Sequence, residues 1–581
     1  MKNKINHIII AIGVALGVFN LSSCIEETFP KNMAVPENIS SSSKSLDYLL
    51  NSLPAFLTTW DTYYGSGNGY EQDWGYPCQM YMRDLLCEDF PMSDNGFNYW
   101  DGIEQGTYLR WAYYFPFYYY YSFIKNANNI VKTAEIAVNG GNEAARYHLG
   151  QGYGYRAFLY LDICRMYEYR KTGVDYLDQE AEKRGIMGLT IPLIDEKTTL
   201  NEMKHNPNAP FWRMYRFIMN DLNNAEAMLD GTTRPNKSFM SKGVIYGLKT
   251  RLWLAMASRF DQSSADLAVQ MEHENDDDGY APLGISSAND CFAKAAEYAQ
   301  KAMNTENFKP LTEEEWTNTT TGFNTANDAW MFGTLVDSKE QINKSFWYTF
   351  QGWLCSEAAW SMTSYNQYRC IGKALYDKIG LGDWRRASWV NPYDAGKNAV
   401  PAGYKTKMTD ADWRRLPAYA NMKFRAGSGA ITTNDLETGL IASIPLMRIE
   451  EMYFDYFEAI AHTQGVPAAA KALQDFVNKN RYTDDSYVCN ATTMEDFIKD
   501  LMVQRRIEFW GEGLVYFDYK RLNLPVTRGY AGSNYEAEYR LNSYAGYVAP
   551  WMNYIITEIE ADANDGIILA PDPSGAILPQ Q

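Results

Sequence analysis

The sequence of 581 residues is poor in histidine and in positive charge, and it has no apolar run long enough to cross a bilayer. Only five histidines are present, and no cysteine or histidine spacing resembles a zinc site. The 71 acidic residues outnumber the 53 lysines and arginines, which gives a net charge of −18. This balance argues against nucleic-acid binding and against docking on anionic lipid by charge.

Sequence motifs of several enzyme classes are also missing. There is no GxSxG nucleophile elbow, HExxH motif or P-loop. No two of the 71 acidic residues stand out as the paired carboxylates of a glycoside hydrolase. The acidic cluster at residues 274–279 lacks EF-hand spacing, which favours a solvated loop over a calcium site. These absences argue against an enzyme, and we expect no catalytic residue, cofactor or metal.

Eight cysteines are present, at wide spacings that indicate no disulfide framework. One bridge remains possible, and the nearest pairs are Cys355 with Cys370 and Cys78 with Cys87. We expect most of these cysteines to be buried free thiols, because an unpaired cysteine behaves as a small apolar side chain.

The N-terminus reads as a lipoprotein signal. Lys2 and Lys4 precede the uncharged run 8–19, which is too short to span a membrane. Residues 21–24 read Leu-Ser-Ser-Cys, a lipobox in which the thiol of Cys24 receives the lipid. An ordinary signal peptide with an incidental cysteine is the alternative. We predict a signal peptide over 1–23 and a lipidated tether over 24–43, with the body anchored to a membrane through lipid on Cys24.

Aromatic side chains are abundant: they make up 15% of the chain, with 44 tyrosines and 16 tryptophans. Many fall in residues 58–106, which are rich in glycine, tyrosine and tryptophan. We predict a long irregular loop there, functional rather than disordered because of its rings. Flat rings on a surface suit the apolar faces of sugars and also extended peptides.

Elsewhere the apolar periodicity predicts helices. Small and large apolar residues alternate in a way that fits stacked helix–turn–helix units of tetratricopeptide type. Residues 309–443 break this pattern and predict a less regular part. The expected helices are 44–57, 111–128, 143–169, 206–229, 241–260, 290–304, 368–378, 446–463, 467–480 and 493–510.

Residues 504–525, QRRIEFWGEGLVYFDYKRLNLP, combine charges with a helical apolar face. Gly511 and Gly513 interrupt that helix and predict a tight helix–turn–helix. Glu508 and Glu512 lie one turn apart, with arginines on both sides. A packed, salt-bridged helix pair is favoured, since a catalytic acid and base would need an open cleft between carboxylates.

This stretch resembles the C-terminal motif of the SusD/RagB family of outer-membrane nutrient-binding lipoproteins, roughly E-L-x-F-E-G-x-x-W-F-D-L-x-R. Gly511 stands where the family has an aromatic residue. Other segments are similar to family elements as well: YRAFLYLDICRMYEYR at 155–170, GLTIPL at 188–193, GDWR at 382–385, and Arg448 with Glu451 at 446–463. The tail lacks the family's usual P-I-P pair.

The resemblance implies a mainly α fold, in which a tetratricopeptide-like scaffold carries long irregular loops and a less regular C-terminal half. It implies a single domain over 44–581, with helical repeats over 44–308, an irregular part over 309–443, C-terminal helices over 444–525 and an extended tail over 526–581. It also implies a cell-surface lipoprotein of the outer membrane. Such a protein captures a glycan or oligosaccharide and hands it to a TonB-dependent, SusC-like transporter. An oligopeptide ligand is the alternative, and a glycoside hydrolase on a helical scaffold is the third possibility.

In the family the ligand site is formed by loops after the first helix and from the irregular half. The residues of this chain that fall in matching regions are aromatic, acidic or basic. These candidates are Asp73, Trp74, Tyr76, Arg83, Tyr99, Trp100, Asp101, Trp353 and Trp360.

Overall fold

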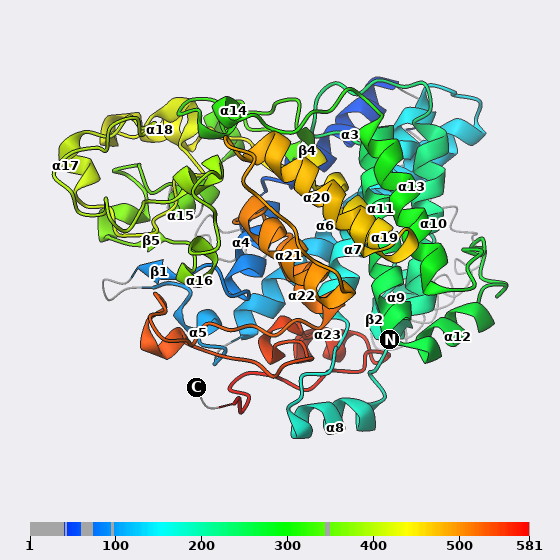
Figure 1. Ribbon diagram of the computed structural model, residues 1–581. Coiled ribbons are helices and arrows are strands. Elements are labelled where there is room, and N and C mark those ends of the chain that lie inside the picture. The colour runs from blue at the N-terminus through cyan, green and yellow to red at the C-terminus, as the bar shows by residue number, and fades with distance from the viewer. Residues whose placement is uncertain are drawn as a thin grey trace, which may run out of the picture.

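The computed structural model describes residues 40, 43–59, 74–93, 98–107, 109–342 and 349–579. Most of the described chain is helical, and Figure 1 shows a helix bundle on the right and a less regular part on the left. The signal peptide, Cys24, the tether up to residue 39 and Asp73 lie outside the described residues.

The bundle is a series of helices in which each packs against its neighbours in chain order. Helix α6 packs on α7, α7 on α10, α11 on α13, and α13 on α19. This arrangement agrees with a helical scaffold, while its division into sequence repeats stays a prediction. The helices are α3 (Ser43–Phe56), α6 (Arg110–Asn139), α7 (Ala145–Tyr167), α10 (Phe211–Met228), α11 (Lys242–Gln262) and α13 (Ala288–Met303). Shorter ones are α8 (Asp175–Arg184), α9 (Leu200–Met203) and α12 (Ser264–Glu272).

Glycines on α7 allow this close packing. A Cβ at Gly152 would lie 2.9 Å from Val131 of α6, and one at Gly150 would lie 2.9 Å from Leu229, just after α10. A Cβ at Gly154 would lie 2.9 Å from Met240. These small residues let neighbouring segments approach α7 closely.

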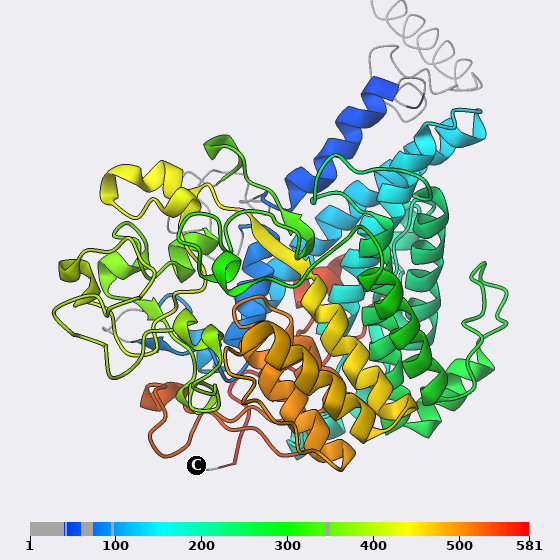
Figure 2. The ribbon, with the colours of Figure 1, turned by 45° about the horizontal axis from the view of Figure 1, so that its top comes forward.

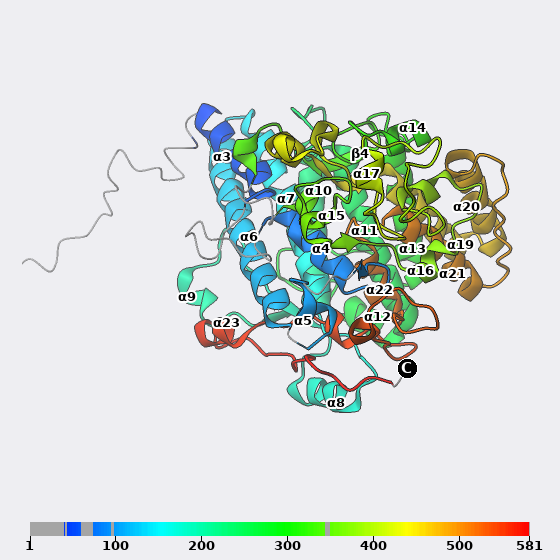
Figure 3. The same ribbon diagram turned by 90° about the vertical axis from the view of Figure 1, so that its left-hand side faces the viewer.

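The second group of helices lies between the bundle and the less regular part, yellow to orange in Figures 1 and 2. It consists of α19 (Ile449–Thr463), α20 (Val466–Arg481), α21 (Met494–Glu508) and α22 (Val515–Leu522). The tail that follows holds one short helix, α23 (Glu558–Ala563), and runs along the lower edge in Figures 1 and 3. Its backbone is tied to the end of α7 and beyond: Tyr554 N–H donates to Met166 O, and Val548 N–H to Lys171 O.

Short elements make up the less regular part. Its helices are α14 (Glu313–Thr317), α15 (Phe350–Leu354), α16 (Lys373–Tyr376), α17 (Asp410–Trp413) and α18 (Leu436–Leu440). Three antiparallel pairs of strands connect distant segments: β1 (Met92–Ser93) with β5 (Tyr368–Arg369), β2 (Leu189–Pro192) with β3 (Asn208–Pro210), and β4 (Trp330–Thr334) with β6 (Ile444–Arg448). The β1–β5 pair brings the segment after residue 92 next to the less regular part.

Three predictions of local structure are wrong. Residues 58–106 contain α4 (Tyr76–Leu85) and α5 (Asp101–Glu104). Pro77 fits the first turn of α4, and every residue of that helix is buried in tertiary contacts. The glycine-rich and aromatic segments on either side of this short helix led to the prediction of a loop. The expected helix 368–378 is a strand, β5, followed by the single turn of α16. The expected helix 446–463 begins at Ile449, because residues 444–448 pair with β4.

The structure also bears on the cysteines, on metal-ligating side chains and on membrane-spanning helices. The seven cysteines within the described residues are free and buried, as expected. No group of metal-ligating side chains suited to an ion occurs in the described part of the chain. None of the described helices combines the length and the apolar character that a membrane crossing needs.

Candidate ligand-binding site

The stretch at 504–525 forms α21, a tight turn and α22. Gly511 and Gly513 have φ of 79° and 67°, a left-handed conformation that glycine adopts without strain. The turn is also packed too closely for a side chain at Gly513, where a Cβ would lie 2.5 Å from Met80 Cα of α4. The predicted helix–turn–helix is confirmed.

A buried charge cluster surrounds Glu508 at the end of α21. Its carboxylate accepts hydrogen bonds from Arg385 at 2.8 Å, from Arg448 at 3.1 Å, and from Arg481 at 2.8 and 2.9 Å. The side chains that meet here come from five segments far apart in the sequence. We call them the Glu508 cluster, and its members are Asp383, Arg385, Lys423, Arg448, Glu450, Arg481, Glu508 and Glu512.

Glu512 is held in the same way. It accepts two hydrogen bonds of 2.9 Å from Arg448 and one of 2.6 Å from Lys423. Burial lowers the pKa of Lys423 to about 8, although the charge of Glu512 opposes this shift. Burial would raise the pKa of Glu508, but the three guanidinium groups hold it well below its usual range.

This geometry has no open cleft. Glu508 is fully buried and Glu512 is only 3% exposed, and each carboxylate is occupied by cations of the chain itself. A general acid and base need access to a substrate and a water molecule. The interpretation of residues 504–525 as a packed, salt-bridged helix pair is confirmed.

Most of the predicted ligand contacts have buried side chains. Five of the candidates have aromatic rings that lie in the core, where no ring face is open to a ligand. They are Trp74, Tyr76, Trp100, Trp353 and Trp360, none of them more than 4% exposed. Direct ligand contact by these rings is not supported, because the apolar faces that a ligand would cover are already packed against the protein.

Arg83 is also an interior residue. It is fully buried and forms an ion pair of 3.1 Å with Asp162 of α7. Tyr76 donates a 2.5 Å hydrogen bond to the same carboxylate. Burial would raise the pKa of Asp162, but Arg83 and Arg165 hold it below its usual value. Arg83 and Tyr76 therefore connect α4 to the helix bundle.

Four rings gather where the segment after β1 meets α15, and we call them the aromatic cluster: Tyr81, Tyr99, Trp100 and Trp353. The ring of Trp353 lies 5.2 Å from Trp100 and 5.6 Å from Tyr99, both edge to face, and 5.8 Å from Tyr81. Tyr99 is 39% exposed, and Asp101 beside it is exposed as well. The structure thus brings together three predicted residues, with a fourth next to them.

Trp360 lies outside this group. It packs in a separate small core with Cys355, Ala426 and Leu440, and its indole N–H donates to Ala430 O. The sequence also gave no indication of Tyr81, which lies on α4 within the stretch expected to be a loop.

Several buried polar groups on the elements around the aromatic cluster lack a hydrogen-bond partner within the described part of the chain. Such groups are rare in folded proteins, because each has lost water without replacement. An ordered water molecule can complete the hydrogen bonding of such a group. These groups are Nε1 of Trp100 and Trp353, Nε2 of Gln351, Oε1 of Gln79, and both amide atoms of Gln367.

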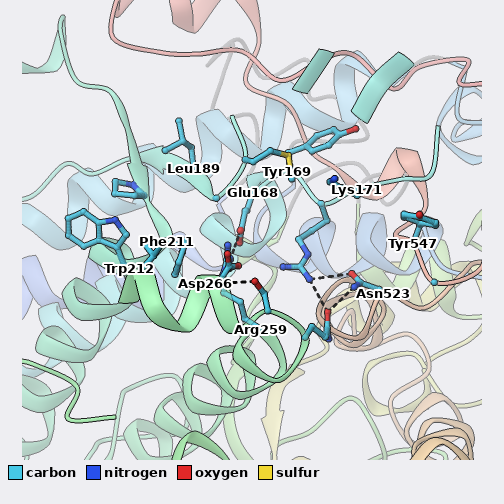
Figure 4. Close-up of a pocket in the computed structure, with 18 residues that line it drawn as sticks. Glu168, Tyr169, Lys171, Leu189, Phe211, Trp212, Arg259, Asp266, Asn523 and Tyr547 are labelled. Carbon is cyan, nitrogen blue, oxygen red and sulfur yellow. Dashed lines mark hydrogen bonds and ion pairs between the residues drawn. The ribbon is translucent and has the colours of Figure 1, made fainter. Parts of the chain in front are cut away.

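A separate pocket of about 560 Å³ lies at the other end of the bundle, shown in Figure 4. It is lined by residues at the end of α7, the start of α10, the end of α11, and α12, together with Asn523 and Tyr547. No sequence motif predicted these residues as ligand contacts, because they are single residues from segments that are far apart in the chain.

Comparison with known proteins identifies the class of this fold. The chain resembles the structure of a SusD-like carbohydrate binding protein from Bacteroides vulgatus ATCC 8482, with 19% identity over 90% of this chain and 97% of that one, and a TM-score of 0.62. A SusD superfamily protein from Bacteroides thetaiotaomicron VPI-5482 has 16% identity over 91% and 99% of the two chains, with a TM-score of 0.60. Surface glycan-binding protein A from Bacteroides thetaiotaomicron, in complex with laminarihexaose, has 14% identity over 91% and 99%, with a TM-score of 0.58.

The fold is therefore SusD-like over nearly the whole chain. Residues 311–577 match the model of the SusD family. The resemblance predicted from the motifs is confirmed. The search of curated proteins returned no match.

Proposed function

We propose that the protein is a cell-surface binding protein for a glycan, and that the glycan binds at the aromatic cluster, where Tyr99 and Asp101 reach the surface. The observation that carries this proposal is that an exposed ring and an exposed carboxylate lie beside Trp100 and Trp353, whose indole N–H groups lack a partner in the described part of the chain. Sugar sites combine a ring that covers the apolar face of a pyranose with groups that hydrogen-bond its hydroxyls. The solved complex of a structural neighbour with laminarihexaose supports the choice of glycan.

Tyr99 has a defined orientation in this site. Its ring stands edge to face on Trp353, with an interplanar angle of 88°. Asp101 accepts hydrogen bonds from Tyr539 at 2.8 Å and from Gln105 at 2.6 Å. The contacts limit the motion of both side chains, so less conformational entropy is lost when a ligand binds.

We also propose how the protein is anchored and which partner receives the ligand. Lipid on Cys24 would hold the protein to the outer membrane, and a TonB-dependent, SusC-like transporter would receive the ligand. Replacing Cys24 by alanine tests the anchor, since the variant should move from the membrane fraction to the soluble fraction.

The proposed role is binding without chemical conversion of the ligand. Glu508 and Glu512, the two carboxylates of the motif at 504–525 that suggested a catalytic pair, are buried in ion pairs, which supports this proposal. Incubation of bound oligosaccharide with the protein should leave its length unchanged by chromatography, and hydrolysis would contradict the proposal.

Binding to a panel of glycans, with laminarihexaose among them, tests the ligand class. Isothermal titration should detect at least one glycan, and Tyr99→Ala should weaken its binding by tenfold or more. Tyr393→Ala is the matched control, because Tyr393 is 81% exposed and belongs to no ring contact of the aromatic cluster. Equal affinity in both variants would remove Tyr99 from the site, and binding of oligopeptides but of no glycan would favour the peptide alternative.

A further inference from the structure

The pocket in Figure 4 contains an arginine whose charge has no acidic partner. Arg170 lies just after α7 and lines the pocket. Within the described residues, no carboxylate oxygen comes close enough to form an ion pair with it, whereas most arginines of the chain have such a partner. In a protein of net charge −18, a guanidinium that forms no ion pair in the described chain calls for a physical explanation.

Amide groups hold Arg170 in place instead. Its Nη2 donates to Gln262 Oε1 at 3.2 Å and to Asn523 Oδ1 at 3.3 Å. Its backbone is fixed as well, because Asn553 accepts from the N–H of Arg170 at 3.0 Å and donates to its carbonyl at 2.8 Å. Amide oxygens orient a guanidinium without neutralising its charge, so the group stays able to bind an anion.

The position of Asn523 is fixed by its backbone conformation and by its side-chain hydrogen bond. It ends α22 in a left-handed conformation, with φ 51° and ψ 44°. Its side-chain nitrogen donates to Gln262 Oε1 at 2.8 Å, and Gln262 Nε2 donates to Arg521 O at 2.7 Å. The amides that hold Arg170 are therefore themselves held by the surrounding structure.

The acidic side chains of the pocket are already neutralised by another cation. Arg259 forms ion pairs with Glu168 and, at 2.7 Å, with Asp266. Burial would raise the pKa of Glu168, but Arg259 and Arg170 hold it below its usual value, so it remains charged. Lys171, next to Arg170, is paired with Glu182 at 2.6 Å. The one guanidinium in the pocket without an acidic partner in the described chain is that of Arg170.

Rings complete the pocket. In the view of Figure 4, Trp212 and Tyr547 lie on opposite sides, with Lys171 near Tyr547. Tyr547 is 41% exposed, and Trp212 is half-buried, with one face stacked on His273 at 3.9 Å and 5°. The volume of about 560 Å³ lies within the range of small-molecule sites. A ligand with a flat apolar face and an acidic group fits such walls.

We propose that this pocket is a second binding site, separate from the aromatic cluster, and that it takes a sugar bearing a carboxylate, with the carboxylate on Arg170. This second proposal holds whichever glycan binds near Tyr99. The Nη1 and Nε groups of Arg170 donate no hydrogen bond to the described chain, and a charge-assisted hydrogen bond from one of them to a carboxylate is stronger than one to a neutral sugar hydroxyl.

The test uses glucuronate and glucose as probes, titrated into the purified protein and followed by ligand-observed NMR. Glucuronate should bind at least tenfold more tightly than glucose, and Arg170→Gln should weaken it by tenfold or more. Asn523→Gly removes one amide that orients Arg170 but keeps the left-handed backbone, and should weaken glucuronate severalfold. Arg414→Gln, an exposed arginine in the less regular part, is the control for charge and should leave binding unchanged.

Thermal unfolding of each variant verifies that the fold is intact. Equal binding of glucuronate and glucose, or unchanged glucuronate binding in Arg170→Gln, would overturn the proposal. Displacement of glucuronate by laminarihexaose would also overturn it, because the two sites would then not be separate.

Discussion

The Glu508 cluster and the aromatic cluster use polar groups in opposite ways. In the first, four carboxylates and their cations are buried and paired with one another. In the second, the indole N–H groups of Trp100 and Trp353 are buried without a partner in the described chain, beside a ring that reaches the surface. The comparison indicates that the motif-rich region is scaffold, while the proposed ligand region depends on single residues that no motif marks.

The largest effect is expected at the centre of the scaffold. Glu508→Gln removes the one negative charge that three buried arginines share, so uncompensated positive charge remains in the interior. We expect a loss of about 3–5 kcal/mol in the free energy of unfolding, measured by urea denaturation. Lys499→Gln is the control, since Lys499 and its partner Glu495 are exposed and the pair should matter little.

The turn between α21 and α22 should be nearly as sensitive. Gly513→Ala places a methyl group against the backbone of Met80 and forces a side chain into a left-handed conformation. We expect a loss of about 2–3 kcal/mol from strain and displacement of α4. Gly532→Ala is the matched control, because Gly532 also has a positive φ, of 79°, but nothing lies within 4 Å of its Cβ position. Equal losses in the two variants would show that packing on α4 is unimportant.

A smaller, pH-dependent effect is expected at Asp84, whose carboxylate accepts a 2.9 Å hydrogen bond from Gly513 N–H. Burial raises the pKa of Asp84 to about 7. The folded state therefore keeps a proton that the unfolded state has lost, and stability falls as pH rises from about 4 to 7. Asp84→Asn, which resembles the protonated acid, should remove this fall and be more stable at pH 8 by about 2 kcal/mol.

Denaturation of Asp84→Asn and the parent at pH 4 and pH 8 tests the sign. The difference between them should be small at pH 4 and favour the variant at pH 8. A parent that gains stability relative to the variant over this range would contradict the raised pKa.

The sequence predicted the helical scaffold well, because its helices carry apolar residues at regular spacing and α11 and α13 begin at capping serines. It failed at α4, a ten-residue helix between glycine-rich and aromatic segments, and at β5 and β6, where pairing with a distant strand overrides helical pattern. Such contacts cannot be read from local sequence.

The site was predicted only in part. Tyr99, Trp100 and Trp353 do meet, although they are 250 residues apart in the chain. Their ring type pointed to this region, but not to which of them reaches the surface, since tryptophan is equally suited to a core and to a sugar platform. Arg170 was missed because its significance lies in the absence of an acidic partner, which only the fold reveals.

The separation of scaffold from ligand region is tested most directly by measuring both stability and glycan affinity in Tyr99→Ala. The ring of Tyr99 is partly exposed and makes one contact with Trp353, so unfolding should change by about 1 kcal/mol or less, while glycan affinity falls by tenfold or more. Unchanged affinity, or a loss of affinity that only accompanies general unfolding, would contradict the assignment of the ligand to the aromatic cluster.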